Sequence, residues 1–226
     1  MAEDKAAQLA IIANEINVCT QCRLHSGRTK TVPGAGNPDA EILFIGEGPG
    51  ANEDKQGLPF VGRSGDYLTY LLNLVNLHRD QVFITNVVKC RPPENRDPLP
   101  DEIITCKSYL DRQIEIIDPL VIATLGRFSM ARYFPNASIT RIHGQPHYDG
   151  DTLRAYYPCF HPAAALRNPA LRRDMEADFH RLHEVVEQVK AMRAGQSPAP
   201  DAPAEQTPDK PDDDTPPEKP IQLRLF

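Results

Sequence analysis

The chain has 226 residues, a formal net charge of −6 and five cysteines, which is enough for one sizeable hydrophobic core and too little for two domains of ordinary size. No apolar run reaches the roughly 20 residues that span a bilayer, and the polar start does not look like a signal peptide, so we expect a cytoplasmic protein rather than a membrane or secreted one. Thiols stay reduced in that compartment, so the cysteines indicate a metal centre rather than disulfides.

The negative charge is concentrated at the C-terminal end. Residues 195–226 contain seven acids and three bases, so this segment carries −4 and the rest of the chain only −2. A nearly neutral body can still present a local basic face. Composition therefore neither supports nor excludes a nucleic-acid partner.

Hydrophobic patterning predicts helices that alternate with short strands. Ser64 is the expected N-cap of the second helix, Asp149-Gly150 a hairpin-type turn, and Asn168-Pro169 the capped start of the final helix. Such alternation predicts a parallel sheet covered on both faces, a three-layer α/β/α domain over residues 1–194. In chain order the predicted elements are a helix over 4–18, a strand over 41–46, a helix over 64–76, a strand over 82–88, a helix over 101–117, a strand over 120–125, a helix near 127–133, a strand over 153–157 and a helix over 168–194.

The segment that follows the last predicted helix differs in composition. Residues 195–220 are rich in Pro, Asp, Glu and Ala and have almost no large apolar side chain. Such a stretch cannot bury enough surface to offset its ordering entropy, so we predict a disordered acidic linker. The last six residues, 221–226, break this pattern.

Four of the cysteines form two pairs. Cys19 and Cys22 lie on a Cys-x-x-Cys turn, and Cys90 and Cys106 bracket a Pro/Arg-rich loop. A short turn converges two thiolates, and a second pair brought in by the fold would complete a four-sulfur shell. Spacing alone does not separate an iron–sulfur cluster from structural zinc. We expect Cys159, the fifth cysteine, to be a buried thiol.

Three loops carry most of the polar chemistry. In an open parallel sheet the ligand crevice lies beyond the carboxyl ends of the strands, and residues 46–62, 85–96 and 161–167 should meet there. The glycine-rich turn over 46–50 would let backbone N–H groups approach a ligand. It fits neither the dinucleotide fingerprint nor the P-loop, so a purely structural turn is the simpler interpretation of that motif alone.

Single residues in these loops have two interpretations each. Asn86 ends a buried strand, and its amide can pair with a ring edge that presents N–H and C=O; alternatively it closes a turn. His161 before a proline is either a functional group or a capping or core histidine. Phe60 is a stacking platform or ordinary core, and Glu47 and Glu53 are pocket carboxylates or solvated loop charges.

The motifs are more informative as an ordered set. Over roughly residues 15–190 they resemble the iron–sulfur uracil-DNA glycosylases, family 4 of that superfamily. This resemblance implies a four-stranded parallel sheet between helices and hydrolysis of the N-glycosidic bond of uracil in DNA, which leaves an abasic site. It also implies a [4Fe–4S] cluster on Cys19, Cys22, Cys90 and Cys106. The motifs that carry the resemblance are Gly46-Glu-Gly-Pro-Gly50, Pro59-Phe-Val-Gly62, Thr85 to Pro93, Asn95-Arg96 and His161 to Leu166.

The resemblance also implies roles in the uracil pocket. The uracil must first be flipped out of DNA. Phe60 would then stack on the ring, the Asn86 amide would bind O4 and N3–H, and His161 would hydrogen-bond O2 as negative charge develops there. Cytosine presents the opposite pattern and leaves buried groups unpaired, at about 1–3 kcal/mol each.

A carboxylate near the sugar would stabilise the developing cation and orient the attacking water. Members of the superfamily with an Asp in the first motif use it for this purpose, but Gly48 occupies the matching position here. We favour Glu53 for this role, with Asn95 as a helper. Glu47 is expected to shape the uracil pocket together with Gly48.

The expected partner is uracil-containing DNA, single- or double-stranded, bound by a monomer. Leu166 would wedge into the space that the flipped base vacates, although a leucine at a helix start also packs inward in many proteins. Four basic residues are expected on phosphates. They are Lys89, Arg91, Arg96 and Arg167.

The C-terminal pentapeptide Gln222-Leu-Arg-Leu-Phe226 has its own resemblance, to the peptide with which bacterial proteins dock on the replicative sliding clamp. The matching positions are Gln222, Leu223, Leu225 and Phe226. A flexible linker of about 25 residues reaches roughly 25–30 Å, which suits a tether. The alternative is an apolar end without function.

Two other functions fit parts of the sequence. One is a glycosylase of the same fold that acts mainly on another deaminated base, such as hypoxanthine. The other is a non-catalytic nucleic-acid-binding module with structural zinc. A brown protein with absorbance near 400 nm would indicate the cluster rather than zinc. Activity on uracil and on hypoxanthine oligonucleotides would distinguish the two glycosylases.

Overall fold

The computed structural model describes residues 4–195. A six-stranded sheet in the order β1-β3-β2-β4-β6-β5 forms its centre. The predicted four-stranded parallel sheet is confirmed, and it consists of β3 (Phe83–Asn86), β2 (Ile42–Gly46), β4 (Val121–Leu125) and β6 (Arg154–Cys159). Two short edge strands were not predicted. They are β1 (Ala35–Gly36), antiparallel to β3, and β5 (His147–Asp149), antiparallel to β6.

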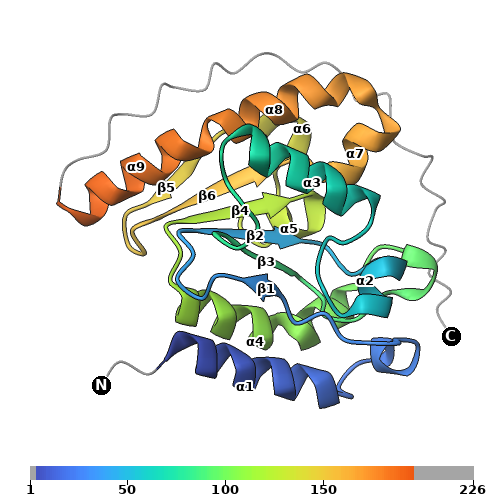
Figure 1. Ribbon diagram of the computed structural model, residues 1–226. Helices are drawn as coiled ribbons and strands as arrows, with labels where there is room; N and C mark the ends of the chain where they lie inside the picture. The colour runs from blue at the N-terminus through green and yellow to red at the C-terminus, as the bar shows by residue number, and fades with distance from the viewer. Residues whose placement is uncertain (1–3, 196–226) are drawn as a thin grey trace, which may run out of the picture.

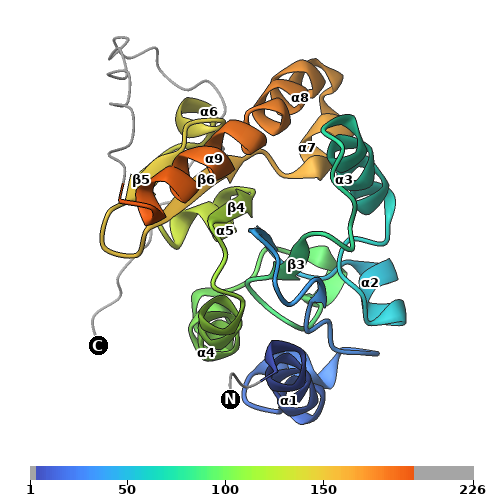
Figure 2. The ribbon, with the colours of Figure 1, turned by 60° about the vertical axis from the view of Figure 1, so that its left-hand side comes forward.

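Helices cover both faces of the sheet, as predicted (Figure 1). One face carries α3 (Arg63–Leu74), α8 (Arg172–His180) and α9 (Leu182–Arg193), and the other carries α4 (Pro100–Ile117). The first helix, α1 (Lys5–Val18), packs on α4 rather than on the sheet (Figure 2). The remaining helices are α2 (Ala51–Gln56), α5 (Arg127–Ala131), α6 (Ile139–Ile142) and α7 (Pro162–Arg167), with 3₁₀ turns η1 (Arg23–Ser26), η2 (Pro93–Asn95) and η3 (Pro169–Leu171).

The side-chain alternation of β2 shows why a continuous apolar run forms this central strand. Phe44 belongs to the core under α3, α8 and α9, where its ring stacks on Phe179 at 5.7 Å. Leu43 and Ile45 belong to the opposite core against α4. Because successive side chains point to opposite faces, a strand buried on both sides must be apolar throughout.

Two predicted helix details are wrong. The N-cap of α3 is Gly62 rather than Ser64, and the N–H of Gly62 donates to the Glu53 carboxylate. The predicted final helix is divided into η3, α8 and α9. Its start is capped by Asn168 as expected, but the Tyr157 hydroxyl donates to the carbonyl of Asp178 at 2.7 Å. A continuous helix would present that carbonyl to the N–H of Leu182, so the contact accompanies the break.

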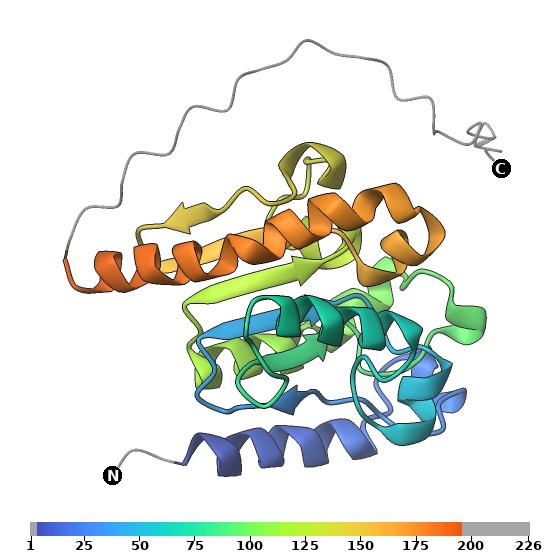
Figure 3. The ribbon, with the colours of Figure 1, turned by 45° about the horizontal axis from the view of Figure 1, so that its top comes forward.

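The parallel strands all run toward the edge of the molecule that carries α2 and α7 (Figure 3). No helix within residues 4–195 combines the length and apolarity needed to cross a bilayer. The predicted linker and the C-terminal pentapeptide lie outside the described residues.

Candidate active site

A cleft of about 890 Å³ opens at the carboxyl ends of the four parallel strands. The end of each strand or the loop after it contributes to the wall. Examples are Glu47 after β2, Asn86 at the end of β3, Gly126 after β4 and His161 after β6. Parallel strands deliver their following loops to one edge, which is why residues so far apart in sequence meet here.

Asn86, Phe60 and His161 line this same cleft. The rings of Phe60 and His161 lie 5.6 Å apart with 30° between their planes. Asn86 is 1% exposed, and within residues 4–195 its Oδ1 has no hydrogen-bond partner. A buried acceptor without a partner is costly, so an orphan acceptor at a cleft wall favours a ligand N–H as the missing donor.

Gly46 makes the meeting of these side chains possible. A Cβ at Gly46 would lie 2.4 Å from Asn86 Oδ1 and 2.6 Å from the Phe60 ring. No side chain fits in that space. The glycine that ends β2 is therefore required by close packing of the amide against the aromatic ring.

Phe60 is held in a rarely populated backbone conformation. Its φ of 52° lies in the left-handed region, and a Cβ at Gly65 would come within 1.9 Å of its carbonyl oxygen. Glu53 fixes the two residues that follow Phe60, because its Oε1 accepts from the N–H groups of Val61 and Gly62 at 2.9 Å each. Positions of this kind cluster at ligand sites, where surrounding structure enforces them.

The Glu53 carboxylate is therefore not a solvated loop charge. Its second oxygen, Oε2, accepts from the N–H of Gly50 at 3.1 Å, which ties the start of α2 to the loop that holds Phe60. Three backbone donors thus hold this carboxylate in a fixed place on the cleft wall.

Glu47 has a different environment. Its Oε1 accepts from the N–H of Phe128 at 3.1 Å, and a Cβ at Gly126, whose φ is 97°, would lie only 2.5 Å from that oxygen. Burial, with a smaller contribution from the charge of Asp97, raises the pKa of Glu47, while the Phe128 N–H opposes the shift. Glu47 is thus a partly buried carboxyl group packed beside His161.

His161 caps the helix that follows it. Its Nδ1 accepts from the N–H of Ala163 at 3.1 Å at the start of α7. Burial, reinforced by the charge of Arg167, lowers the pKa of His161 to about 4. The ring is therefore neutral at physiological pH, and because Nδ1 is an acceptor in this network, the proton is on Nε2.

This pKa predicts how stability depends on pH. The folded-state pKa of about 4 lies below the ordinary 6.5, so the native state binds fewer protons between these values. The free energy of unfolding should then fall by about 3 kcal/mol as pH drops from 6.5 to 4. Urea unfolding across this range measures the slope. His161→Asn keeps a capping acceptor but cannot titrate, so a slope as steep as in the wild type would contradict the assignment.

Lys89 does not point toward DNA, and its predicted phosphate contact is wrong. The side chain is 1% exposed, and Nζ donates to Thr85 Oγ1 at 2.6 Å, to the Asn86 carbonyl at 2.9 Å and to Gln113 Oε1 at 2.7 Å. Burial lowers the pKa of its ammonium to about 7. The physical reason is that α4 presents Gln113 as an acceptor inside the fold.

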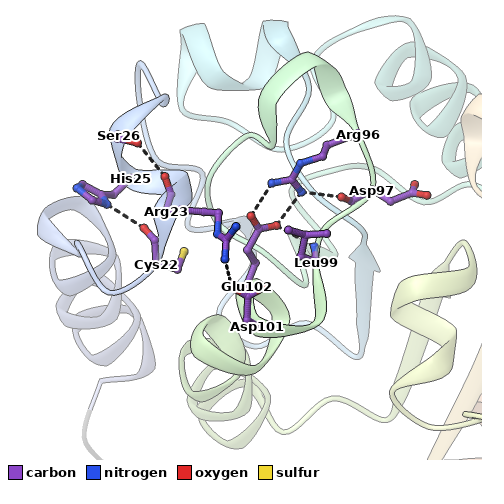
Figure 4. A network of polar contacts seen from close by, with 9 residues as sticks. All are labelled: Cys22, Arg23, His25, Ser26, Arg96, Asp97, Leu99, Asp101 and Glu102. Carbon is purple, nitrogen blue, oxygen red and sulfur yellow. Dashed lines mark hydrogen bonds and ion pairs between the residues drawn. The ribbon is translucent and has the colours of Figure 1, made fainter. Parts of the chain in front are cut away.

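Arg96 is likewise held by a buried carboxylate, as Figure 4 shows. Its two terminal nitrogens donate to Glu102 at 2.9 and 2.6 Å, and Glu102 is 0% exposed. Glu102 also accepts from the N–H of Leu99. Arg96 also lines the cleft, and its side chain is 33% exposed. A guanidinium has five N–H donors, so the pair with Glu102 fixes the 93–99 loop while the phosphate contact of Arg96 stays a prediction.

Three other predicted residues line the cleft, and a fourth, Arg91, contacts one of them. Leu166 on α7 is 38% exposed and lines the cleft together with Arg167, so it does not pack inward. Asn95 also lines the cleft, and its Oδ1 accepts from Nε of Arg91 at 2.8 Å. Sequence reasoning missed several lining residues, for which the only signal was their place next to predicted motifs. They include Asn52, Arg63, Ser64, Arg127 and Phe160.

The four paired cysteines line one small cavity between the N-terminal turn and α4. It is bounded by Cys19, Cys22, Cys90 and Cys106. Arg28 Nη1 donates to Cys90 Sγ at 3.3 Å and to the carbonyl of Cys19 at 2.7 Å. Four thiols around one cavity, with an N–H donor to a sulfur, fit an iron–sulfur group. Across residues 4–195, no three His, Cys, Asp or Glu side chains are arranged to hold a single metal ion.

The fifth cysteine is separate. Cys159 is 1% exposed within the main core, as the sequence predicted, and burial raises the pKa of its thiol well above the ordinary value.

Comparison with known proteins gives consistent matches. The family model for the uracil DNA glycosylase superfamily matches residues 33–201. A type-4 uracil-DNA glycosylase of Sulfurisphaera tokodaii is 50% identical over 77% of this chain and 83% of its own length. The type-4 uracil-DNA glycosylases of Archaeoglobus fulgidus and Thermotoga maritima are each 45% identical, over 77% and 76% of this chain and 91% and 92% of theirs.

Proposed function

This chain belongs to the uracil DNA glycosylase superfamily and is a uracil-DNA glycosylase that excises uracil in DNA repair, and from that premise we propose how its own residues act. The cleft accepts a uracil flipped out of DNA, and the N-glycosidic bond is hydrolysed there to leave an abasic site. The observation that carries this proposal is the Oδ1 of Asn86, which has no hydrogen-bond partner in the described part of the chain and belongs to the same cleft as Phe60 and His161.

Asn86 and Phe60 recognise the base in this proposal. The Oδ1 of Asn86 accepts the N3–H of uracil and its amide N–H donates to O4, while Phe60 stacks on the ring face. Cytosine offers no N3–H and a donor in place of O4. It therefore leaves buried polar groups unpaired, at about 1–3 kcal/mol for each.

His161 stabilises the leaving group. Bond cleavage leaves positive charge on the sugar and negative charge on uracil, and a hydrogen bond to O2 strengthens as that charge develops. The neutral ring carries its proton on Nε2, and this N–H is the donor to O2. The Nδ1 contact with the Ala163 N–H fixes the ring orientation before the substrate binds.

Glu53 is the proposed carboxylate beside the sugar, and Asn95 at the rim helps to orient the attacking water. Three backbone N–H groups hold the Glu53 charge in place, which is the preorganisation that stabilises a developing cation. Glu47 and Gly48 shape the base pocket in this proposal, since both line the cleft.

Substitution of the two glutamates tests this division. We expect Glu53→Gln to lower the single-turnover excision rate by about 100-fold or more, and Glu47→Gln by less than about 10-fold. Because Glu53 also anchors the loop that holds Phe60, KM and melting temperature should be measured beside the rate. The reverse order of the two rate losses, with both proteins folded, would transfer the carboxylate role to Glu47.

The substrate itself is tested by comparing bases. Oligonucleotides that carry one uracil or one hypoxanthine at the same position are incubated with the protein, and strand breaks are counted after alkali treatment. Uracil should be released at least 10²-fold faster, the factor expected from about 3 kcal/mol of lost hydrogen bonding. Faster release of hypoxanthine would overturn the assignment of uracil as the main substrate.

The DNA surface is proposed to lie over the cleft rim. Leu166 enters the space that the flipped base leaves, and Arg91 and Arg167 contact phosphates. Arg96, which lines the cleft and is 33% exposed, stays in this set, whereas Lys89 is left out because its side chain is buried.

The cysteine cavity is the proposed cluster site. Cys19, Cys22, Cys90 and Cys106 would hold a [4Fe–4S] cluster, which would cross-link the N-terminal turn, the loop after β3 and α4 and would supply a one-electron redox centre. Arg28 supports the site through its contacts with Cys90 and Cys19.

The C-terminal pentapeptide is proposed to bind the bacterial sliding clamp, on the sequence resemblance alone. Deletion of residues 222–226 should abolish binding to purified clamp in surface plasmon resonance and leave excision on free oligonucleotide unchanged. The control replaces the polar linker residue Gln206 by Ala. Clamp binding that survives the deletion would refute the proposal.

A further inference from the structure

Lys89 is a buried lysine, and its hydrogen-bond partners within residues 4–195 include no carboxylate. The three acceptors around Nζ are a hydroxyl, a carbonyl and a side-chain amide, at 2.6, 2.9 and 2.7 Å. Burial of a lysine is costly, and these contacts account for all three ammonium donors.

The sheet register shows what Lys89 supplies. Ala35 of β1 pairs with Ile84 of β3 in an antiparallel ladder. The ladder ends at Ala35, and before it the two segments meet with a different offset, because the N–H of Val32 donates to the carbonyl of Lys89 at 2.8 Å. Pro33 lies between these two contacts and has no N–H to donate. In this region the ammonium of Lys89 donates to the carbonyl of Asn86.

The same polar cluster ties Pro33 itself to the site. The Pro33 carbonyl accepts from Thr85 Oγ1 at 3.0 Å and from Gln113 Nε2 at 2.8 Å. Thr85, Asn86, Lys89 and Gln113 are each at most 2% exposed. These hydrogen bonds thus fix the backbone of Asn86 on the side away from the cleft, while its Oδ1 has no partner among residues 4–195.

We infer that Lys89 is a positioning residue for uracil recognition, which acts by holding the Asn86 backbone so that the amide meets the base edge. It lies outside the residues that line the cleft, so it acts through Asn86 rather than on the base. The inference rests on the proposed role of Asn86. A displacement of about 1 Å in a positioning group costs on the order of 10²-fold in rate, which sets the expected scale.

A double-mutant cycle tests this coupling. Lys89→Met removes the ammonium and keeps the length of the side chain, and Asn86→Ala removes the amide. Single-turnover rates on a uracil oligonucleotide are measured for the wild type, both single variants and the double variant. We expect Lys89→Met to lower the rate about 10- to 100-fold in the wild-type background and less than threefold beside Asn86→Ala. An equal factor in both backgrounds would overturn the inference.

The cycle also separates the two hypotheses. If Asn86→Ala leaves the rate unchanged, the proposed function of Asn86 fails; if Asn86→Ala is severe and Lys89→Met is neutral, only the inference about Lys89 fails. Because Lys89 also borders the cysteine cavity, absorbance near 400 nm and melting temperature are recorded for each variant. Lys89→Gln serves in the same cycle if the Met variant does not fold. Lys107→Met, at an exposed ion pair with Asp111, is the control and should keep the wild-type rate.

Discussion

Replacement of Asn86 by alanine should lower uracil excision by about 10²- to 10⁴-fold and leave the fold as stable as the wild type or slightly more so. Two hydrogen bonds to the base are lost, each at about 1–3 kcal/mol, and 1.36 kcal/mol corresponds to a factor of ten in rate. In the free protein, however, the Asn86 Oδ1 is a buried acceptor without a partner within the described residues. Its removal relieves a desolvation cost instead of breaking a contact.

The expected loss of activity without loss of stability in Asn86→Ala has a matched control. Thr124 in β4 carries a buried hydroxyl that likewise has no hydrogen-bond partner in residues 4–195, and it lies outside the cleft lining. Thr124→Val should therefore raise the melting temperature slightly and keep full activity. The rate is measured in single turnover on a uracil oligonucleotide, and stability by thermal melting. A rate loss below tenfold for Asn86→Ala would remove the amide from base recognition.

The strands were predictable because burial on both faces requires continuous apolar runs, and Phe44 with its neighbours Leu43 and Ile45 shows that requirement directly. The two edge strands were not, since β1 has two residues and β5 three, with exposed or half-buried positions. The break in the final helix depends on a hydroxyl 21 residues away, Tyr157 on the Asp178 carbonyl. No local pattern carries such a contact.

The position of the site was predictable for a related reason. Parallel strands bring their following loops to one edge, so Asn86 and His161 were expected to line one cleft, and they do. The direction of charged side chains was not predictable, because a basic residue in a loop has the same local sequence whether it faces solvent or an interior acceptor. Lys89 donates to Gln113 and Arg96 pairs with Glu102, and both partners lie on α4.

The cysteine cavity yields the second large effect, which concerns stability rather than recognition. The four thiols belong to three segments, the N-terminal turn, the loop after β3 and the middle of α4. Without a bound group, the turn is held to the rest by the packing of Leu24 on Val88, by the Arg28 contact with Cys90 Sγ and by the exposed ion pair between Arg23 and Asp101. Exposed pairs contribute little, about 0–1 kcal/mol.

Cys90→Ser should therefore abolish the absorbance near 400 nm and lower the melting temperature by about 6–12 °C, which corresponds to on the order of 3 kcal/mol for a domain of this size. The matched control is Cys159→Ala, because this thiol is buried in the main core away from the cavity and should leave the colour unchanged. Iron analysis of the purified wild type should give about four irons per chain. One zinc per chain in a colourless protein would contradict the cluster and indicate a structural zinc site. Loss of stability alone does not distinguish the two, because Cys90→Ser would destabilise a zinc site as well. The metal content of the wild type therefore decides between cluster and zinc.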